Sequence, residues 1–283
     1  ELSPNGILGV NIMVAMNHYK EMVLTAVEEK INVIISGAGL PKDLPELVKG
    51  SKTKIAPIVS SGKAAHLITK LWDRKFNYLP DMIIVEGPDA GGHLGFSLEQ
   101  LVANPRIELG QIVKDVIESI KEFEDKYKKK IPVIAAGGIF DGKDIANYLK
   151  MGAAGVQIAT RFIATDECDA DINFKNAIIN SKKEDIQFVS SPVGMPGRAI
   201  TNKFIKKVEE GKIPVKRCYD CLITCNPKTT PYCISKALIE AVNGNVDNGL
   251  IFTGSNAHRI NEIVSVKQLM NQLVTETELA MST

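Results

Sequence analysis

Six short apolar runs, each followed by a longer segment, constrain the fold of this chain more than any other feature. The runs are rich in Val and Ile and apolar throughout, which is typical of strands buried on both faces. Their alternation with helical segments predicts right-handed β–α–β units and a parallel sheet. The expected strands are Ile7–Met13, Asn32–Ser36, Lys54–Val59, Asp81–Glu86, Ile131–Ala136 and Gly155–Ala159.

Helical periodicity fills the gaps between these runs and returns in the last third of the chain. From about Asp169 the alternation stops, and an irregular stretch rich in Lys, Pro and Cys follows. We expect a small, mostly helical second domain there, packed over the mouth of the first. The predicted helices are His18–Lys30, Asp43–Gly50, Gly62–Trp72, Leu109–Lys129, Gly142–Met151, Asn173–Ser181, Ser235–Asn243 and Val264–Glu278.

Six strands are too few for an eight-stranded barrel, so two architectures are compatible with the pattern. An open, doubly wound sheet would be expected to carry a glycine-rich dinucleotide fingerprint after its first strand, but only Val14–Asn17 follow there. Chemically informative residues instead follow nearly every strand, where α/β barrels place their sites. We therefore predict a TIM (β/α)8-type barrel whose first two units precede Glu1.

The predicted domains are a barrel over residues 1–168, a lid over 169–250 and a segment over 251–283 that returns to the barrel. The net charge of +1 gives no reason to expect nucleic acid or an anionic membrane as a partner. Four of the five cysteines are clustered, which is unlike a secreted disulfide framework and favours a cytoplasmic location.

The loop Glu86–Gly95 carries the strongest functional signal. It follows a buried strand and contains four glycines and a proline, so its backbone can approach another group closely. It also holds His93, and histidine has the side-chain pKa nearest to neutrality, which suits proton abstraction from carbon. A turn whose histidine only fills a gap is the structural alternative. We predict that His93 is catalytic.

Two later loops predict a phosphate site. Gly137 and Gly138 follow the fifth run, and Ala159 and Thr160 follow the sixth. The last two strands of such barrels commonly bind phosphate, because glycine leaves backbone N–H groups free to donate and threonine adds a hydroxyl. A tight turn is the alternative explanation of the glycine pair, but the pairing of the two loops favours phosphate.

Several motifs together resemble the nitronate monooxygenases, formerly called 2-nitropropane dioxygenases. That family includes the FMN-dependent enoyl-acyl-carrier-protein reductase II enzymes, and the resemblance runs over nearly the whole chain. The matching segments are Gly9–Met13 (GVNIM), Ser36–Gly39 (SGAG), Val85–Phe96 (VEGPDAGGHLGF), Ala135–Asp141 (AAGGIFD) and Val156–Phe162 (VQIATRF).

The resemblance implies a TIM barrel with non-covalently bound FMN and a small lid domain. It places His93 near the flavin and Asn11 near the flavin ring or ribityl chain. The family begins with two further strands, the first ending in a Gly-Gly-Met turn, and we expect them before Glu1. The predicted cofactor residues are Asn11, Glu86, Ala90, Gly91, Gly92, Ala136, Gly137, Gly138, Ala159, Thr160, Gly254 and Ser255.

The activity that the resemblance implies is FMN-dependent oxidation of alkyl nitronates with O2. The alternative is an NAD(P)H-dependent reductase that acts on an enoyl thioester. A flavin-free phosphate-binding barrel, such as an isomerase, would use the same two loops and is the competing class. In each case the partner is a small-molecule substrate, and assembly as a homodimer is left open.

The sequence leaves open the roles of two charged residues near the predicted site and of the clustered cysteines. Asp89 could orient His93 or face solvent, and Arg198 could shape the pocket or pair with a carboxylate at a domain interface. The cysteines have the tight spacing of a zinc or iron–sulfur site, but reduced cysteines in a compact subdomain, or a disulfide, also explain them. The cluster is Cys218, Cys221, Cys225 and Cys233.

Overall fold

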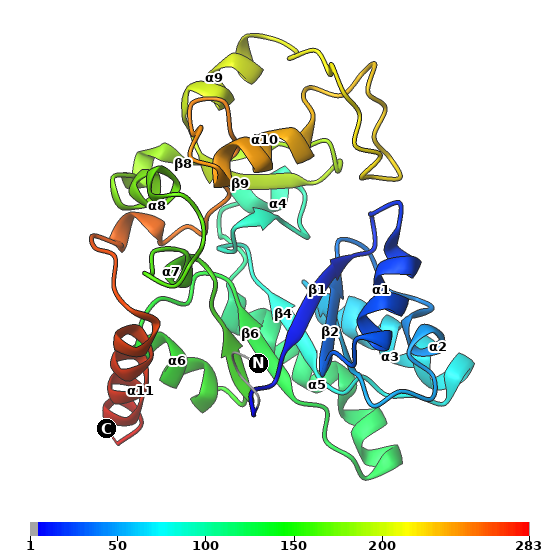
Figure 1. The fold of residues 1–283 in the computed structure, drawn as a ribbon. Coiled ribbons are helices and arrows are strands. Elements are labelled where there is room, and N and C mark those ends of the chain that lie inside the picture. Colours follow the sequence, from blue (N-terminus) through cyan, green and yellow to red (C-terminus); the bar gives the residue numbers. More distant parts are fainter. Residues whose placement is uncertain (1–4, 283) are drawn as a thin grey trace.

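A parallel six-stranded sheet forms the centre of the computed structural model, which describes residues 5–282 (Figure 1). The strands follow one another in the order β1-β2-β3-β4-β6-β7, and every neighbouring pair is parallel. All six predicted strands are confirmed. They are β1 (Gly9–Met13), β2 (Val33–Gly37), β3 (Lys54–Val59), β4 (Ile83–Glu86), β6 (Val133–Ala136) and β7 (Gly155–Gln157).

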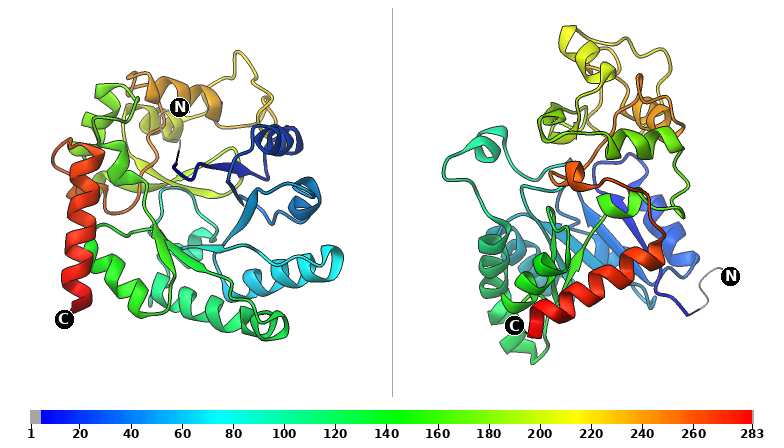
Figure 2. Two further views of the ribbon diagram at one scale, coloured as in Figure 1. Left: turned by 60° about the horizontal axis from the view of Figure 1, so that its bottom comes forward. Right: turned by 90° about the vertical axis from the view of Figure 1, so that its left-hand side faces the viewer.

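Helices line the outer side of this sheet in an arc, and the sheet curls away from them as half of a barrel (Figure 2). Among the described residues β1 and β7 are the two edges of the sheet. Residues 1–4 and residue 283 lie outside the described part of the chain. The helices of this half are α1 (Tyr19–Glu28), α2 (Leu44–Leu47), α3 (Gly62–Phe76), α4 (Leu98–Val102), α5 (Leu109–Tyr127), α6 (Gly142–Lys150) and α7 (Thr160–Ile163).

Both faces of the sheet are apolar, which explains the uninterrupted apolar runs. Ile34, Ile83 and Val133 belong to the main core, which joins the sheet to the outer helices. Their neighbours Ile84 and Ile134 belong to a second cluster on the concave face. Full burial of such a side chain contributes roughly 1.5–3 kcal/mol, so alternate residues stabilise two different layers.

Side-chain caps fix where several helices begin. The Ser61 side chain accepts a hydrogen bond from Ala64 N at 3.2 Å and caps α3. Asp141 and Asp144 form a reciprocal capping box at the start of α6. Each such cap contributes about 1 kcal/mol and aligns the helix directly after its strand loop.

The lid lies above the carboxyl ends of the strands (Figure 1). We predicted a mostly helical lid, but it also contains a hairpin. The two-residue strand β5 (Gly92–His93) adds to this hairpin, pairing antiparallel with β9, so the loop after β4 is part of the lid sheet. The lid elements are α8 (Ile172–Ile179), β8 (Ile186–Ser190), β9 (Pro196–Ile200), α9 (Lys203–Glu210) and α10 (Ile234–Val242).

The last helix, α11 (Val266–Ser282), returns to the half-barrel and packs against α6. An apolar cavity of about 660 Å³ lies between α11 and the concave face of the sheet, bordered by Ile84, Ile134 and Leu273. Within residues 5–282 no helix is long and apolar enough to cross a membrane. The exact limits proposed for the three domains remain a prediction.

Candidate functional site

A cavity of about 860 Å³ opens at the carboxyl ends of β1 to β4. Asn11 and Met13 reach it from β1, and Glu86 and His93 reach it from β4 and β5. Parallel strands bring their carboxyl ends to one edge of a sheet, so residues far apart in sequence meet there. The cavity therefore occupies the position at which α/β barrels bind substrates.

A second cavity, of about 240 Å³, lies beside the loops after β4, β6 and β7. Asn11, Glu86 and Gly91 line both cavities, so the two are neighbouring parts of one site. All predicted cofactor residues except Gly92 and Ser255 line the smaller cavity, whereas Gly92 lines the larger one. Ser255 lines neither.

His93 is held between the half-barrel and the lid. Its Nε2 lies 2.6 Å from the Ser191 hydroxyl, and its ring packs edge-on against Phe252 with centroids 5.0 Å apart. Burial lowers the pKa of His93 below its ordinary value of 6.5. The imidazole is therefore neutral near pH 7, the state in which it can accept a proton.

Glu86 is a second titratable group of the site. Its side chain is half-buried at the end of β4, and desolvation raises the pKa of its carboxyl from 4.5 to about 7. The described residues place no cation or hydrogen-bond donor against this carboxyl. A buried polar group without a partner is costly, so Glu86 is suited to a ligand that hydrogen-bonds with it.

The glycine loops pack against each other without room for side chains. A Cβ on Gly91 would lie 2.5 Å from the carbonyl carbon of Thr253, and one on Gly137 would lie 2.9 Å from Ala90 N. Gly137 and Gly138 also have φ angles of 99° and 78°, which favour glycine. Both glycines line the smaller cavity, and their backbone forms a cradle on its wall.

The segment 253–257 closes over this cradle. Gly254 N donates to Thr160 Oγ1 at 3.0 Å, and the Asn256 amide donates to the Gly138 carbonyl at 2.5 Å. Ser255 contributes only its backbone here, because its N–H donates to the Asp89 carbonyl at 3.1 Å. Asn256, rather than Ser255, is the side chain of this segment that faces the smaller cavity.

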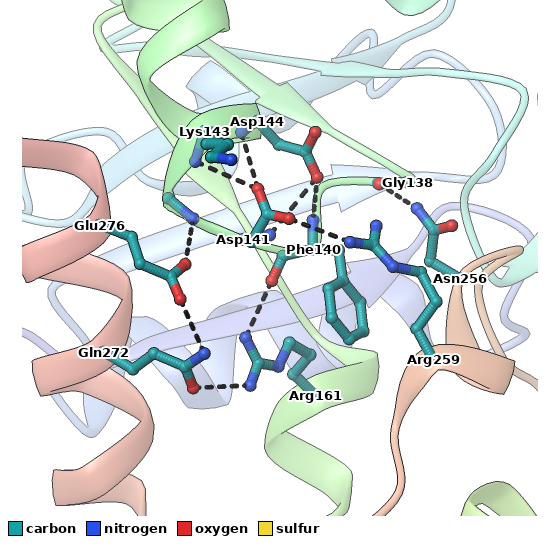
Figure 3. A network of polar contacts seen from close by, with 11 residues as sticks. Gly138, Phe140, Asp141, Lys143, Asp144, Arg161, Asn256, Arg259, Gln272 and Glu276 are labelled. Atoms are coloured by element: carbon teal, nitrogen blue, oxygen red, sulfur yellow. Dashed lines mark hydrogen bonds and ion pairs between the residues drawn. The ribbon is translucent and has the colours of Figure 1, made fainter. Parts of the chain in front are cut away.

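A network of hydrogen bonds and ion pairs connects the loop after β6 to the C-terminal segment (Figure 3). The Arg161 guanidinium donates to the Phe140 carbonyl at 3.0 Å and to Gln272 of α11 at 3.1 Å. Arg259 donates to Asp141 at 2.9 Å, and both guanidinium groups lie over the Phe140 ring, at 4.6 Å and 4.0 Å from its centroid. The C-terminal segment thus fixes the loop after β6.

The structure also settles the roles of Asp89 and Arg198. Asp89 does not orient His93, because it forms a two-pronged ion pair with Arg106 at 3.0 Å and 2.8 Å. Arg198 is buried and donates to the carbonyls of Pro88 and Ala90 at 2.7 Å and 2.6 Å. The Arg198 side chain therefore binds backbone carbonyl groups of the loop after β4 and does not pair with a carboxylate.

Sequence reasoning did not assign roles to several residues of the site. Ser191 and Phe252 reach His93 from the lid side, and neither carries a local signal for that contact. Gly37–Gly39, quoted above only as a family motif, line the larger cavity after β2. Their position directly after a buried strand is the signal that could have identified them.

The four clustered cysteines lie together in the lid and line a separate cavity of about 200 Å³. They form no disulfide. Among the described residues, no three His, Cys, Asp or Glu side chains converge as ligands of a single metal ion.

The residues of the two cavities fit FMN. The glycine backbone next to Thr160 could receive a phosphate, and the unpartnered Glu86 carboxyl lies between that cradle and the larger cavity. A neighbouring cavity of about 860 Å³ leaves room for a ring system and a substrate.

A curled parallel sheet with these two cavities at its carboxyl ends defines an α/β-barrel-type protein. The sequence profile of the family described as "Nitronate monooxygenase" matches residues 2–276. The chain belongs to the nitronate monooxygenase family, and the predicted family is confirmed.

Individual relatives agree with this assignment. A probable nitronate monooxygenase of Staphylococcus saprophyticus is 38% identical over 131 residues, which are 46% of this chain and 34% of that protein. FabK from Thermotoga maritima has a TM-score of 0.78 and 28% identity, over 99% of this chain and 79% of that one. Nitroalkane oxidase from Streptomyces ansochromogenes has the same fold, with a TM-score of 0.70 and 22% identity over 93% of this chain and 69% of that one. The chain spans about a third to a half of the length of the curated relatives that it matches.

Proposed function

We propose that this chain carries the flavin site of an FMN-dependent oxidoreductase that oxidises alkyl nitronates with O2. The observation that carries the proposal is the half-buried His93, with its lowered pKa, at the cavity that adjoins the glycine cradle. FMN, when bound, would supply the electron transfer between substrate and oxygen. Family membership supports this chemistry, and the name shared by the curated Staphylococcus relatives supports this substrate class.

The protein's own groups have distinct tasks in this proposal. The backbone after β6 and Thr160 would hold the phosphate, and Asn11 and Glu86 would contact the ribityl chain or the ring edge. His93 takes up the proton α to the nitro group when a neutral nitroalkane is the substrate. Ser191 and Phe252 keep the imidazole in place at the cavity.

One observation favours a second candidate. FabK, an enoyl-acyl-carrier-protein reductase II, superposes on nearly the whole of this chain with 28% identity. In a reductase of this type NAD(P)H supplies a hydride and an enoyl thioester accepts one, while His93 would bind or protonate the substrate. A flavin-free phosphate-binding barrel is the remaining alternative.

The five cysteines of the chain are all unpaired, which is typical of a protein in a reducing compartment. We therefore propose a cytoplasmic location.

Two assays on the full-length protein separate these candidates. The first measures O2 consumption with the nitronate anion of nitroethane, and the second measures flavin bleaching by NADH or NADPH under argon. We expect O2 consumption with the nitronate and no rapid bleaching. Rapid bleaching followed by reoxidation with an enoyl thioester would assign the reductase, and activity in neither assay would reject both flavin candidates.

A further inference from the structure

Four of the five cysteines surround one cavity of the lid. Cys218, Cys221, Cys225 and Cys233 line a space of about 200 Å³ together with Leu222 and Thr230. Three come from one loop, and the fourth is the N-cap residue of α10. Cys233 lies eight residues beyond Cys225, and the fold places it at the same cavity as the Cys-x2-Cys-x3-Cys loop.

The loop that carries three of these cysteines is mostly cationic, and among the residues that line the cavity itself the charged one is Asp220. Residues 212–228 contain four cationic side chains, Lys212, Lys216, Arg217 and Lys228, and one acidic side chain, Asp220. The Asp220 carboxylate accepts a hydrogen bond from Asn17 at 2.6 Å. The N-terminus of the nine-residue helix α10 adds a partial positive charge beside Cys233.

The placement of the four cysteines around a cavity distinguishes between the groups that four thiolates bind. Zinc gathers its ligands on one point, with Zn–S distances of about 2.3 Å, and no three of the described side chains converge in that way. In a four-iron cluster each thiolate binds a different iron atom, so the ligands surround a core. Cysteines spread around a cavity match the second arrangement.

We propose that Cys218, Cys221, Cys225 and Cys233 bind a four-iron, four-sulfur cluster in the lid. The Asp220 N–H, 3.4 Å from the Cys218 sulfur, provides a hydrogen bond of the kind that stabilises cluster thiolates. Binding releases the thiol protons and leaves four deprotonated ligands on the iron atoms. The proposal does not depend on the flavin or on the reaction catalysed.

Such a cluster would be attached to the wall of the flavin site. Cys221 O accepts a hydrogen bond from Asn17 N at 3.3 Å, and Ile223 N donates to Ala15 O at 3.0 Å, so the cysteine loop pairs with the segment after β1. Met13 and Phe252 pack against the same apolar cluster as Cys221 and Cys225. The bound group would therefore anchor the lid at the edge of the larger cavity.

The test is a count of iron and acid-labile sulfide in full-length protein that is purified anaerobically and reconstituted with ferrous iron and sulfide. We expect about four iron atoms and four sulfides per chain, and an electron paramagnetic resonance signal after dithionite reduction. The signal should persist after flavin is removed, which separates it from a flavin radical. One zinc per chain, two iron atoms per chain, or no bound metal would overturn the proposal.

Variants identify the ligands. Cys221→Ser and Cys225→Ser should each lower the iron content at least about fivefold, whereas Cys168→Ser, a cysteine outside the cavity, should leave it unchanged. Retained iron in both ligand variants would overturn the assignment. Circular dichroism shows whether a variant has folded, and the wild-type metal count decides the proposal even if none does.

Discussion

The His93 imidazole and the Ser191 hydroxyl, 2.6 Å apart, join the loop after β4 to the lid across 98 residues of sequence. Val193 N donates to the same hydroxyl at 3.3 Å, so the Ser191 oxygen is itself held in position. This contact sets the direction of the imidazole ring. It makes the lid part of the candidate site as well as a cover.

Ser191→Ala should lower kcat about 10- to 100-fold with little change in KM, because a misdirected base loses reactive geometry and not substrate contacts. Ser191→Thr keeps the hydroxyl and should restore most of the activity. Steady-state kinetics with nitroethane tests this. An equal loss in both variants would show that Ser191 has only a packing role.

Removing the imidazole should lower the activity with neutral nitroethane much more than the activity with its nitronate anion. His93→Gln should lower kcat/KM for neutral nitroethane roughly 10²- to 10⁴-fold, the usual contribution of a general base. The nitronate anion has already lost its proton and should be affected far less. Comparable losses with both forms would contradict a role of His93 as base.

The pH profile follows from the lowered pKa of His93. A base whose pKa is lowered by burial stays neutral to lower pH, so the acid limb of kcat/KM for nitroethane should lie below pH 6.5. Measurements between pH 5 and pH 8 would locate it. An acid limb above pH 7, or an unchanged limb in His93→Gln, would contradict this account.

Glu86 should make the flavin-free protein less stable as the pH rises. Burial favours the protonated carboxyl, so between about pH 4.5 and 7 the folded state binds more protons than the unfolded state. The free energy of unfolding should fall by about 3 kcal/mol across this interval and then level off. Urea denaturation of wild type and Glu86→Gln, compared at each pH, isolates this contribution. Parallel curves for the two proteins would disprove it.

Gly91→Ala should weaken FMN binding, because its Cβ would meet the backbone at Thr253 and Gly254, at 2.5 Å and 2.6 Å. Overpacking of this kind costs about 1–3 kcal/mol, which corresponds to an increase in Kd of about 5- to 150-fold. Gly211→Ala is the matched control, since no atom lies within 4 Å of its added Cβ. Flavin fluorescence titration compares them, and equal affinities would show that segment 253–254 can move freely.

The sheet was predicted strand by strand because burial on both faces leaves a continuous apolar run, as in Lys54–Val59, whose limits agree with β3. The lid sheet was missed for the opposite reason. Its strand β5 has only two residues, Gly92 and His93, and exists because β9 pairs with it from a distant part of the chain. No local periodicity encodes such a partner.

The same distinction applies to the site. His93, Gly137 and Thr160 could be predicted because each follows a strand, and the topology then places them at one edge. Ser191 could not, because its contact with His93 depends on how the lid folds back over the half-barrel. Thr160 was predicted only as a phosphate ligand. Its hydroxyl also accepts a hydrogen bond from Gly254 N, a structural contact that the sequence did not indicate.

The central claim, that the two adjoining cavities form an FMN site, is tested most directly by the flavin content of the full-length protein. The measurement combines the visible absorbance of the purified protein with mass spectrometry of the flavin released on denaturation. The account predicts about one FMN per chain and a lower content in Gly91→Ala than in Gly211→Ala. A colourless protein that takes up no FMN on reconstitution would contradict it.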